Sequence, residues 1–263
     1  GILVAAGSND QLNGAVGVGN VRPGIASGTV GTAMAIVATV DGIDNDMYPE
    51  LLKGRHPVAG LWYLLTYAKT SGVLLSWFRD ALAPSFTYEE FLAEAARVPP
   101  GANGLLCLPH FSGTATPTFR SDVTGAFIGL TLGHGRAHFV RAVTEAVCFC
   151  ARDAVELSAA AATRPESLRM LGGATQSTFW MQLMASVVRL PLDVPTCSEA
   201  SVLGGAIFAG VAAGLFSSIQ QASETFYHVA AHYEPDEGDT SRYDGIYAAY
   251  RQAMERLYPG ALG

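Results

Sequence analysis

One long amphipathic segment, from His138 to about Ala160, constrains the fold of this chain more than any other feature. Its apolar residues recur at intervals of three and four, which predicts a helix with one buried face. That face consists of Phe139, Val143, Ala146, Val147, Cys150, Ala154 and Val155. The opposite side carries two charged pairs with i, i+4 spacing, Arg141–Glu145 and Arg152–Glu156. Such a helix needs a second apolar layer to cover it, and we expect it to pack on a sheet.

Short apolar segments on both sides of this helix have the length and composition of strands, and glycine or proline ends several of them. We predict strands at residues 2–6, within 25–37, and at 61–67, 105–108, 125–132, 168–171 and 192–194. We predict further helices at residues 72–82, 178–188, 199–215 and 243–257, and one that begins at Thr87. Residues 41–46 are expected to form a solvated acidic loop, and residues 235–239 an acidic linker. This alternation of strand, loop and helix is typical of the α/β class.

The composition argues against several functional classes. A net charge of −7 disfavours binding to nucleic acid or to an anionic membrane, because such surfaces need clustered basic side chains. Lys53 and Lys69 are the only lysines, and neither lies in a P-loop motif. No apolar run reaches the roughly 18 residues of a membrane span, and no secretory signal is visible. We therefore expect a soluble cytoplasmic protein whose four cysteines are reduced and buried.

Three short segments carry residues that suit a phosphate or hydroxyl ligand. Asp10 and Gln11 follow the first apolar segment on a glycine-flanked turn, although Asp is also common as a turn former or helix N-cap. A second segment, Gly28-Thr29-Val30-Gly31, would let a backbone approach a ligand closely, and a plain hairpin turn is the alternative. The third, Gly172-Gly173, ends a strand shortly before Ser177, a plausible N-cap, and close helix packing would also explain its glycines.

In combination these segments resemble the C-terminal lobe of the FGGY carbohydrate kinases, and the resemblance covers essentially the whole chain. It is carried by residues 7–11 with 14–17, by 28–31, by 108–113, by 125–145 and by 172–182. Val30, Thr144 and Ala174 depart from the residues usual at their positions. The resemblance implies an actin-like ATPase lobe, which is ribonuclease H-like, with a mixed β-sheet flanked by helices. It also implies one domain over residues 1–263.

The resemblance implies a role for each segment. Asp10 would be the general base, and Gln11 would hold a neighbouring hydroxyl of the sugar. The phosphates of ATP would lie against Gly28, Thr29 and Gly31, where backbone N–H groups and a hydroxyl can stabilise charge. The adenosine would lie on the second glycine segment, formed by Gly172, Gly173, Ala174 and Ser177. The cofactors would be ATP and Mg²⁺, with the metal ligand coming mainly from the N-terminal lobe, so no metal-binding residue is assigned here.

The expected partners are a small sugar or polyol and the N-terminal, sugar-binding lobe of the same kinase, which this chain does not contain. The chain has no Asp-x-Gly-Thr phosphate loop, so we expect a fragment that is inactive or nearly so by itself. The favoured function is a kinase that phosphorylates a ketose. The alternative within the family is a glycerol kinase, and the alternative outside it is a non-catalytic lobe that binds a nucleotide or a partner. A second copy of the chain, forming a homodimer, is a further possible partner. His110, Arg120 and the loop at 113–117 are left outside the catalytic set, although Arg120 and that loop could line the nucleotide cleft.

Overall fold

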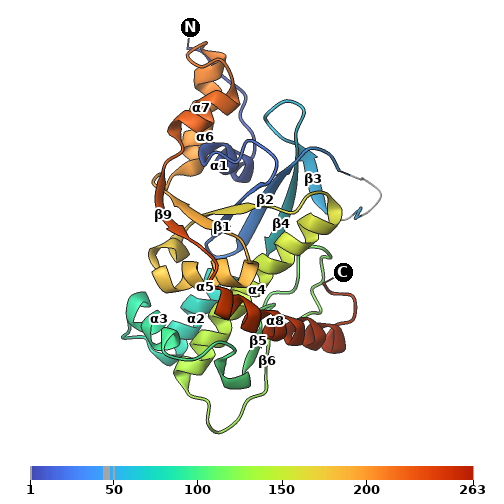
Figure 1. Cartoon of the computed structure of the whole chain (residues 1–263), viewed down its shortest axis with the longest axis vertical. Helices are drawn as coiled ribbons and strands as arrows, with labels where there is room; N and C mark the ends of the chain where they lie inside the picture. The colour runs from blue at the N-terminus through green and yellow to red at the C-terminus, as the bar shows by residue number, and fades with distance from the viewer. Residues whose placement is uncertain (1, 44–47, 50, 263) are drawn as a thin grey trace.

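The computed structural model describes residues 2–43, 48–49 and 51–262, and strands among these residues form one large sheet (Figure 1). The strands of this sheet are β1 (Ile25–Val30), β2 (Met34–Val40), β3 (Leu52–Arg55), β4 (Trp62–Ala68), β7 (Ser167–Leu171), β8 (Leu192–Pro195) and β9 (Val229–Tyr233). Their order is β3-β4-β2-β1-β7-β8-β9. Neighbours β1, β7 and β8 are parallel and the other pairs antiparallel, so the sheet is mixed. A separate pair, β5 (Leu106–Leu108) and β6 (Ala126–Ile128), is antiparallel.

Helices cover both faces of the sheet, which confirms the predicted α/β lobe of the actin-like ATPase type. One face carries α1 (Asp10–Gly17), with α6 (Ala200–Ala212) and α7 (Ile219–Phe226) packed beside it. The other face carries α4 (Arg136–Ala161) and α5 (Thr178–Val188). Beyond α4 and α5 lie α2 (Gly72–Leu82), α3 (Tyr88–Ala96) and α8 (Glu237–Leu257), as Figure 1 shows. Two short 3₁₀ helices complete the description, η1 (Ala102–Gly104) and η2 (Gly173–Gln176).

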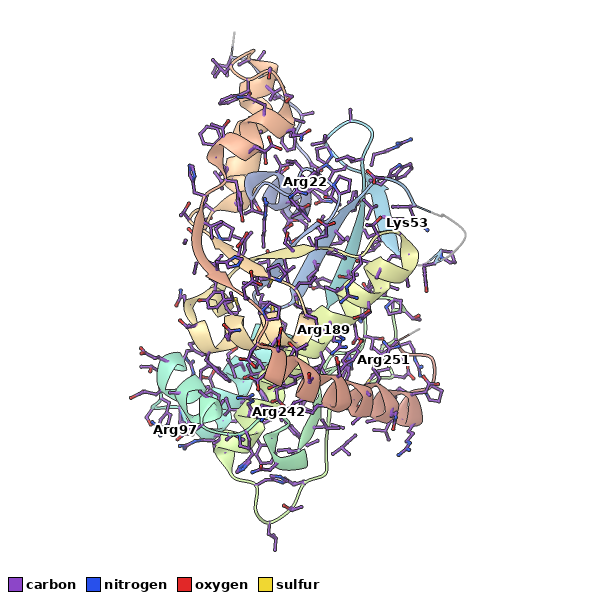
Figure 2. All side chains as sticks on the ribbon, in the orientation of Figure 1. Arg22, Lys53, Arg97, Arg189, Arg242 and Arg251 are labelled. Carbon is purple, nitrogen blue, oxygen red and sulfur yellow. The ribbon has the colours of Figure 1, made fainter. Side chains whose placement is uncertain are left out.

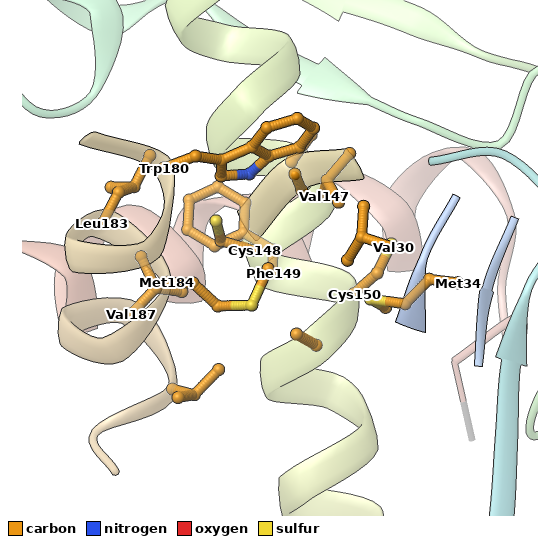
Figure 3. Packing of buried hydrophobic residues seen from close by; sticks show 14 of the residues in the cluster. Val30, Met34, Val147, Cys148, Phe149, Cys150, Trp180, Leu183, Met184 and Val187 are labelled. Atoms are coloured by element: carbon orange, nitrogen blue, oxygen red, sulfur yellow. The ribbon is translucent and has the colours of Figure 1, made fainter. Parts of the chain in front are cut away.

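The main core lies between the sheet and the α4–α5 layer. The predicted apolar stripe of α4 is buried there, and in Figure 3 Val147 and Cys148 of α4 lie opposite Trp180 and Met184 of α5. Val30 lies next to Cys150 in the same view, so the first hairpin also contributes to this core. Burial of such side chains contributes about 1.5–3 kcal/mol each, which explains why the long amphipathic helix was a good guide to the fold.

The charged side of α4 differs from its prediction, because Arg152 and the whole Arg141–Glu145 pair are buried. We placed Arg141 and Glu145 opposite the buried stripe, yet both side chains are buried, with 5% and 1% of their surfaces exposed. Arg141 Nε donates to Glu145 Oε1 at 2.7 Å, and the same oxygen accepts from the Gly101 N–H at 2.9 Å and the Tyr243 hydroxyl at 2.8 Å. Because Gly101 follows α3 and Tyr243 belongs to α8, the pair ties together three separate parts of the chain.

Other predicted elements also differ from the structure. Residues 2–6 form no strand, and Ile2 and Val4 are exposed, because no described strand pairs with this segment. The strand expected at 125–132 is limited to β6, and the linker expected at 235–239 already contains the first turn of α8, capped by Asp236. Of the acidic loop at 41–46, residues 44–46 lie outside the described residues. Elements α1, β3, α7 and β9 were not predicted.

Candidate active site

Asp10 is the first residue of α1, and its carboxylate faces solvent. Asn9, rather than Asp10, caps the helix, because Asn9 Oδ1 accepts from the Leu12 N–H at 2.9 Å. The Asp10 carboxylate accepts from the backbone N–H of Gln11 at 3.0 Å and from Gln11 Nε2 at 3.3 Å. A carboxylate at this end of a helix is also favoured by the helix dipole. The fold therefore leaves the Asp10 carboxylate free of a capping role, with Gln11 beside it.

Helix α1 is held in place by α6, and glycines let the two helices approach each other closely. A β-carbon on Gly17 would overlap the backbone carbonyl of Ala200, and one on Gly204 would overlap that of Asn13. Gly204 thus lets the backbone of α1 come close to α6. This contact fixes the position of α1 against α6.

A cavity of about 200 Å³ lies between the start of α1 and the β1 strand. Its walls consist of Asp10, Gln11, Gly14, Ala15, Ser27, Gly28, Thr29, Val37, Leu171 and Ser201. The structure thus brings the Asp10–Gln11 pair and the Gly28–Thr29 pair to one cavity. Ser27, Leu171 and Ser201 were missed by the sequence analysis; no local signal could have linked Ser201 to Asp10 across 191 residues.

Gly28 and Thr29 lie within β1 rather than in a loop, and they face opposite sides of the sheet. A β-carbon on Gly28 would lie 2.8 Å from Met170 Sδ and 3.1 Å from Ile36 Cγ1, so the core itself demands glycine there. Thr29 points to the α1 side, and its hydroxyl makes no hydrogen bond to any described residue. Val30 is buried in the core, with 1% exposed, so its departure from the family pattern lies away from the cavity.

Gly31 begins the turn between β1 and β2, and this turn is bound to the start of α2. The Gly31 carbonyl accepts from the Gly72 N–H at 2.8 Å, and the Thr32 carbonyl accepts from the N–H groups of Ser71 and Val73 at 3.1 and 3.3 Å. These carbonyls satisfy N–H groups that the first turn of a helix leaves unpaired. Gly31 itself is exposed.

The second glycine segment lies beside the end of β1, because β1 and β7 pair in parallel with Thr29 opposite Leu171. Gly172 has a positive φ of 92°, whereas a β-carbon on Gly173 would meet no atom within 4 Å. Ala174 is buried, with 6% exposed. Ser177 caps α5, as predicted, and its Oγ accepts from the Trp180 N–H at 3.2 Å. Both glycine segments therefore lie at the carboxyl ends of adjacent parallel strands, where α/β sheets bind ligands.

The walls of this cavity contain no Lys or Arg among the described residues. The cationic side chains labelled in Figure 2 are spread over the molecule, from Arg22 near α1 to Arg97 after α3. Arg120 donates to the Asp122 carboxylate and to the Pro259 carbonyl, so its guanidinium is already engaged. The hydroxyl-bearing residues of these walls are Ser27, Thr29 and Ser201. The described residues hold no group of three His, Cys, Asp or Glu side chains arranged for a metal ion.

A second cavity, of about 450 Å³, lies on the opposite face of the sheet. Its walls come from β2, β4, α4, α8 and the loop at 114–117, and they include His110. The residues of this loop thus line a different space from the one that contains Asp10 and Thr29. Among the described helices, none is long and apolar enough to cross a membrane.

Comparisons with known proteins identify the lobe. The C-terminal domain model of the FGGY family of carbohydrate kinases matches residues 25–213, a range that contains both glycine segments. The chain is 30% identical to a xylulose kinase of Staphylococcus epidermidis over 250 residues, which are 95% of this chain and 50% of that protein. It is 35% identical to a glycerol kinase of Stenotrophomonas maltophilia over 185 residues, which are 70% of this chain and 36% of that protein.

The solved structure of xylulose kinase from Rhodospirillum rubrum superposes with a TM-score of 0.88 at 29% identity, covering 97% of this chain and 51% of that one. The chain spans about half the length of the curated xylulose kinases it matches. The fold and the family match agree with each other. The chain belongs to the FGGY family of carbohydrate kinases, and it corresponds to the C-terminal domain of that family.

Proposed function

We propose that this chain is the nucleotide-binding lobe of an ATP-dependent sugar kinase and that Asp10 is its general base. The observation that carries the proposal is that Asp10 and Thr29 line one cavity. On one side is an exposed carboxylate, and on the other is a hydroxyl that has no hydrogen-bond partner among the described residues. A base must reach the hydroxyl that it deprotonates, and a phosphate site must lie close by.

The proposed reaction uses these groups in order. An oxygen of a sugar hydroxyl attacks the γ-phosphorus of ATP, and its proton passes to the Asp10 carboxylate as the new O–P bond forms. The bond from the γ-phosphorus to the β–γ bridging oxygen breaks, and ADP leaves with the electron pair. The Gln11 amide, which already donates to the Asp10 carboxylate, would also hold a neighbouring sugar hydroxyl. General base catalysis of this kind contributes about 10²–10⁴-fold.

The two glycine segments would hold ATP. The backbone of Gly28 to Gly31 and the Thr29 hydroxyl would face the phosphates, and the open space beside Gly173 would admit the ribose and purine. The Ser177 oxygen accepts a hydrogen bond when it caps α5, so its O–H is left to donate to an acceptor atom of the adenine ring. Mg²⁺ would neutralise charge on the phosphates, and its protein ligand would come mainly from the N-terminal lobe.

A ketose is the favoured substrate, because curated relatives matched over 94–97% of this chain are named xylulose kinases. Glycerol is the second candidate, because a relative named glycerol kinase is 35% identical over 185 residues. Specificity would depend mainly on the N-terminal lobe, which is also the proposed partner. The test uses the two-lobed protein, which is this chain joined to its N-terminal lobe. An assay of ADP release by this protein with xylulose, ribulose, xylitol and glycerol would decide among the substrates.

The variant Asp10→Asn in the two-lobed protein tests the base. We expect the turnover number to fall by about 10²–10⁴-fold, while the affinity for ADP, measured by calorimetry, stays within twofold. Near-parental turnover would contradict the base assignment. A two-lobed protein that binds ADP but phosphorylates no substrate of the panel would favour the non-catalytic lobe.

A further inference from the structure

Ser201, at the start of α6, makes a direct hydrogen bond to the residue proposed as the base. Its hydroxyl donates to the backbone carbonyl oxygen of Asp10 at 2.9 Å, and Ser201 also lines the cavity. We infer that Ser201 is a positioning residue, which sets the place of the Asp10 carboxylate relative to the cavity through this bond. The inference rests on the proposed function.

Few other hydrogen bonds hold Asp10 in place. The Asp10 side chain contacts its own neighbour Gln11, and the Asn9 side chain bonds within α1. Of the hydrogen bonds that Asp10 makes within the described part of the chain, the bond from Ser201 is the one that comes from another element. A serine hydroxyl has a single hydrogen, and this one is used on Asp10. Ser201 therefore meets the cavity only as an acceptor, which suits a sugar hydroxyl and not a phosphate oxygen.

Gly14 gives the bond the space that it needs. This residue lies one turn after Asp10 in α1, and a β-carbon on it would lie 3.3 Å from Ser201 Oγ. Such a contact is tight enough to displace the hydroxyl by a few tenths of an ångström. Alanine would otherwise favour the helix over glycine. Gly14→Ala thus perturbs the Ser201–Asp10 bond without weakening α1, which separates positioning from stability.

The test uses steady-state kinetics of the two-lobed protein with Ser201→Ala, Gly14→Ala and the double variant. We expect Ser201→Ala to lower kcat by about 10- to 100-fold, since a shift of about 1 Å at a reacting group can cost 10²-fold. Gly14→Ala should lower kcat by a smaller factor, because it displaces the hydroxyl by only a few tenths of an ångström. ADP affinity should stay at the parental value in each variant. The melting temperature should also stay unchanged in Ser201→Ala, and it should stay unchanged or rise in Gly14→Ala. The double variant should lose no more than Ser201→Ala does, because without the hydroxyl the methyl has nothing to displace. Ser201→Thr, which keeps the hydroxyl, should retain most of the parental kcat.

Two controls complete the design. Ser241→Ala removes an exposed hydroxyl that donates to a carbonyl within α8, and it should change neither kcat nor ADP affinity. Asp10→Asn reports on the proposed function separately. If Asp10→Asn is inactive while Ser201→Ala and Gly14→Ala keep parental kcat, the positioning role is wrong and the proposed function stands. If Asp10→Asn keeps its turnover, the base assignment fails and the positioning role fails with it. Fully additive losses in the double variant would also overturn the inference.

Discussion

Gly172 lies so close to the carbonyl oxygen of Val30 that a β-carbon on residue 172 would overlap it. Its φ of +92° is also one that side chains with a β-carbon rarely adopt. The glycine that ends β7 is therefore in direct backbone contact with the strand that carries Thr29. This contact joins the two segments that we propose hold the phosphates and the adenosine.

Gly172→Ala should destabilise the fold by about 1–3 kcal/mol, from backbone strain and overlap together. Gly173→Ala is the matched control, because a β-carbon there meets no atom within 4 Å. It should leave the urea midpoint unchanged and weaken ADP binding, since its methyl would enter the proposed adenosine site. Equal urea midpoints for the two variants would contradict the packing argument, and unchanged ADP affinity in Gly173→Ala would contradict the proposed site.

The α1–α6 contact offers a second neighbouring pair. Gly204→Ala places a methyl group on the backbone of Asn13 and should cost about 1–3 kcal/mol, as overpacking does. Gly205→Ala meets no atom within 4 Å and lies in the interior of α6, where alanine is favoured by about 1 kcal/mol. Chemical denaturation should therefore place the two variants on opposite sides of the parent. The idea fails if both variants stabilise the chain.

Glu145→Gln should be strongly destabilising. The substitution leaves the buried Arg141 without its carboxylate, and breaking such a buried pair typically costs about 3–5 kcal/mol. Asp80→Asn removes the acid from the exposed Arg79–Asp80 pair and should cost no more than about 1 kcal/mol. Urea unfolding followed by circular dichroism gives both values. A loss below about 1 kcal/mol for Glu145→Gln would show that the pair is not important for stability.

Acid should weaken the fold through two buried histidines. Burial lowers the pKa of His56 and of His110 to about 4, against 6.5 for an exposed histidine. Between pH 6.5 and 4 the unfolded chain binds protons that the folded chain does not, so stability falls as the pH drops, by about 3 kcal/mol for each histidine at pH 4.

Unfolding midpoints of the parent and of His110→Gln, measured from pH 7 to pH 4, should converge as the pH falls. His232 provides a contrast of opposite sign, because hydrogen bonds to Asp193 and Glu234 raise its pKa. The stability that His232 contributes to the fold is present below pH 6.5 and is lost as the pH rises through the raised pKa. A parallel pH dependence of parent and His110→Gln would refute the assignment to His110.

Periodicity located the elements that have a continuous buried face, such as α4 and α5, because a regular apolar stripe needs a partner layer. It failed at residues 2–6, since an apolar run predicts a strand only where a neighbouring strand exists. It also failed at α1, where a glycine-flanked turn was expected at Asp10 and Gln11; Gly14 and Gly17 lie within that helix. Those glycines serve a tight helix contact with α6, which no local pattern reveals.

The candidate site was predictable in part. The resemblance named Asp10, Gln11 and the glycine segments, and the structure places Asp10 and Thr29 in one cavity. Ser201 could not have been found, because its link to Asp10 depends on the packing of two distant helices. The burial of Arg141 and Glu145 was also hidden, because i, i+4 charge pairs look the same in sequence whether solvent or Tyr243 lies above them.

The turn after β1 and the first turn of α2 are joined by three hydrogen bonds, from Ser71, Gly72 and Val73. Because these bonds hold the turn against the helix, a displacement of Gly31 should also displace the start of α2. Trp77 lies on the exposed side of that helix, with 55% of its surface accessible. Trp77, one of three tryptophans in the chain, is thus an intrinsic fluorescent reporter for movement of the hairpin that we propose faces the phosphates.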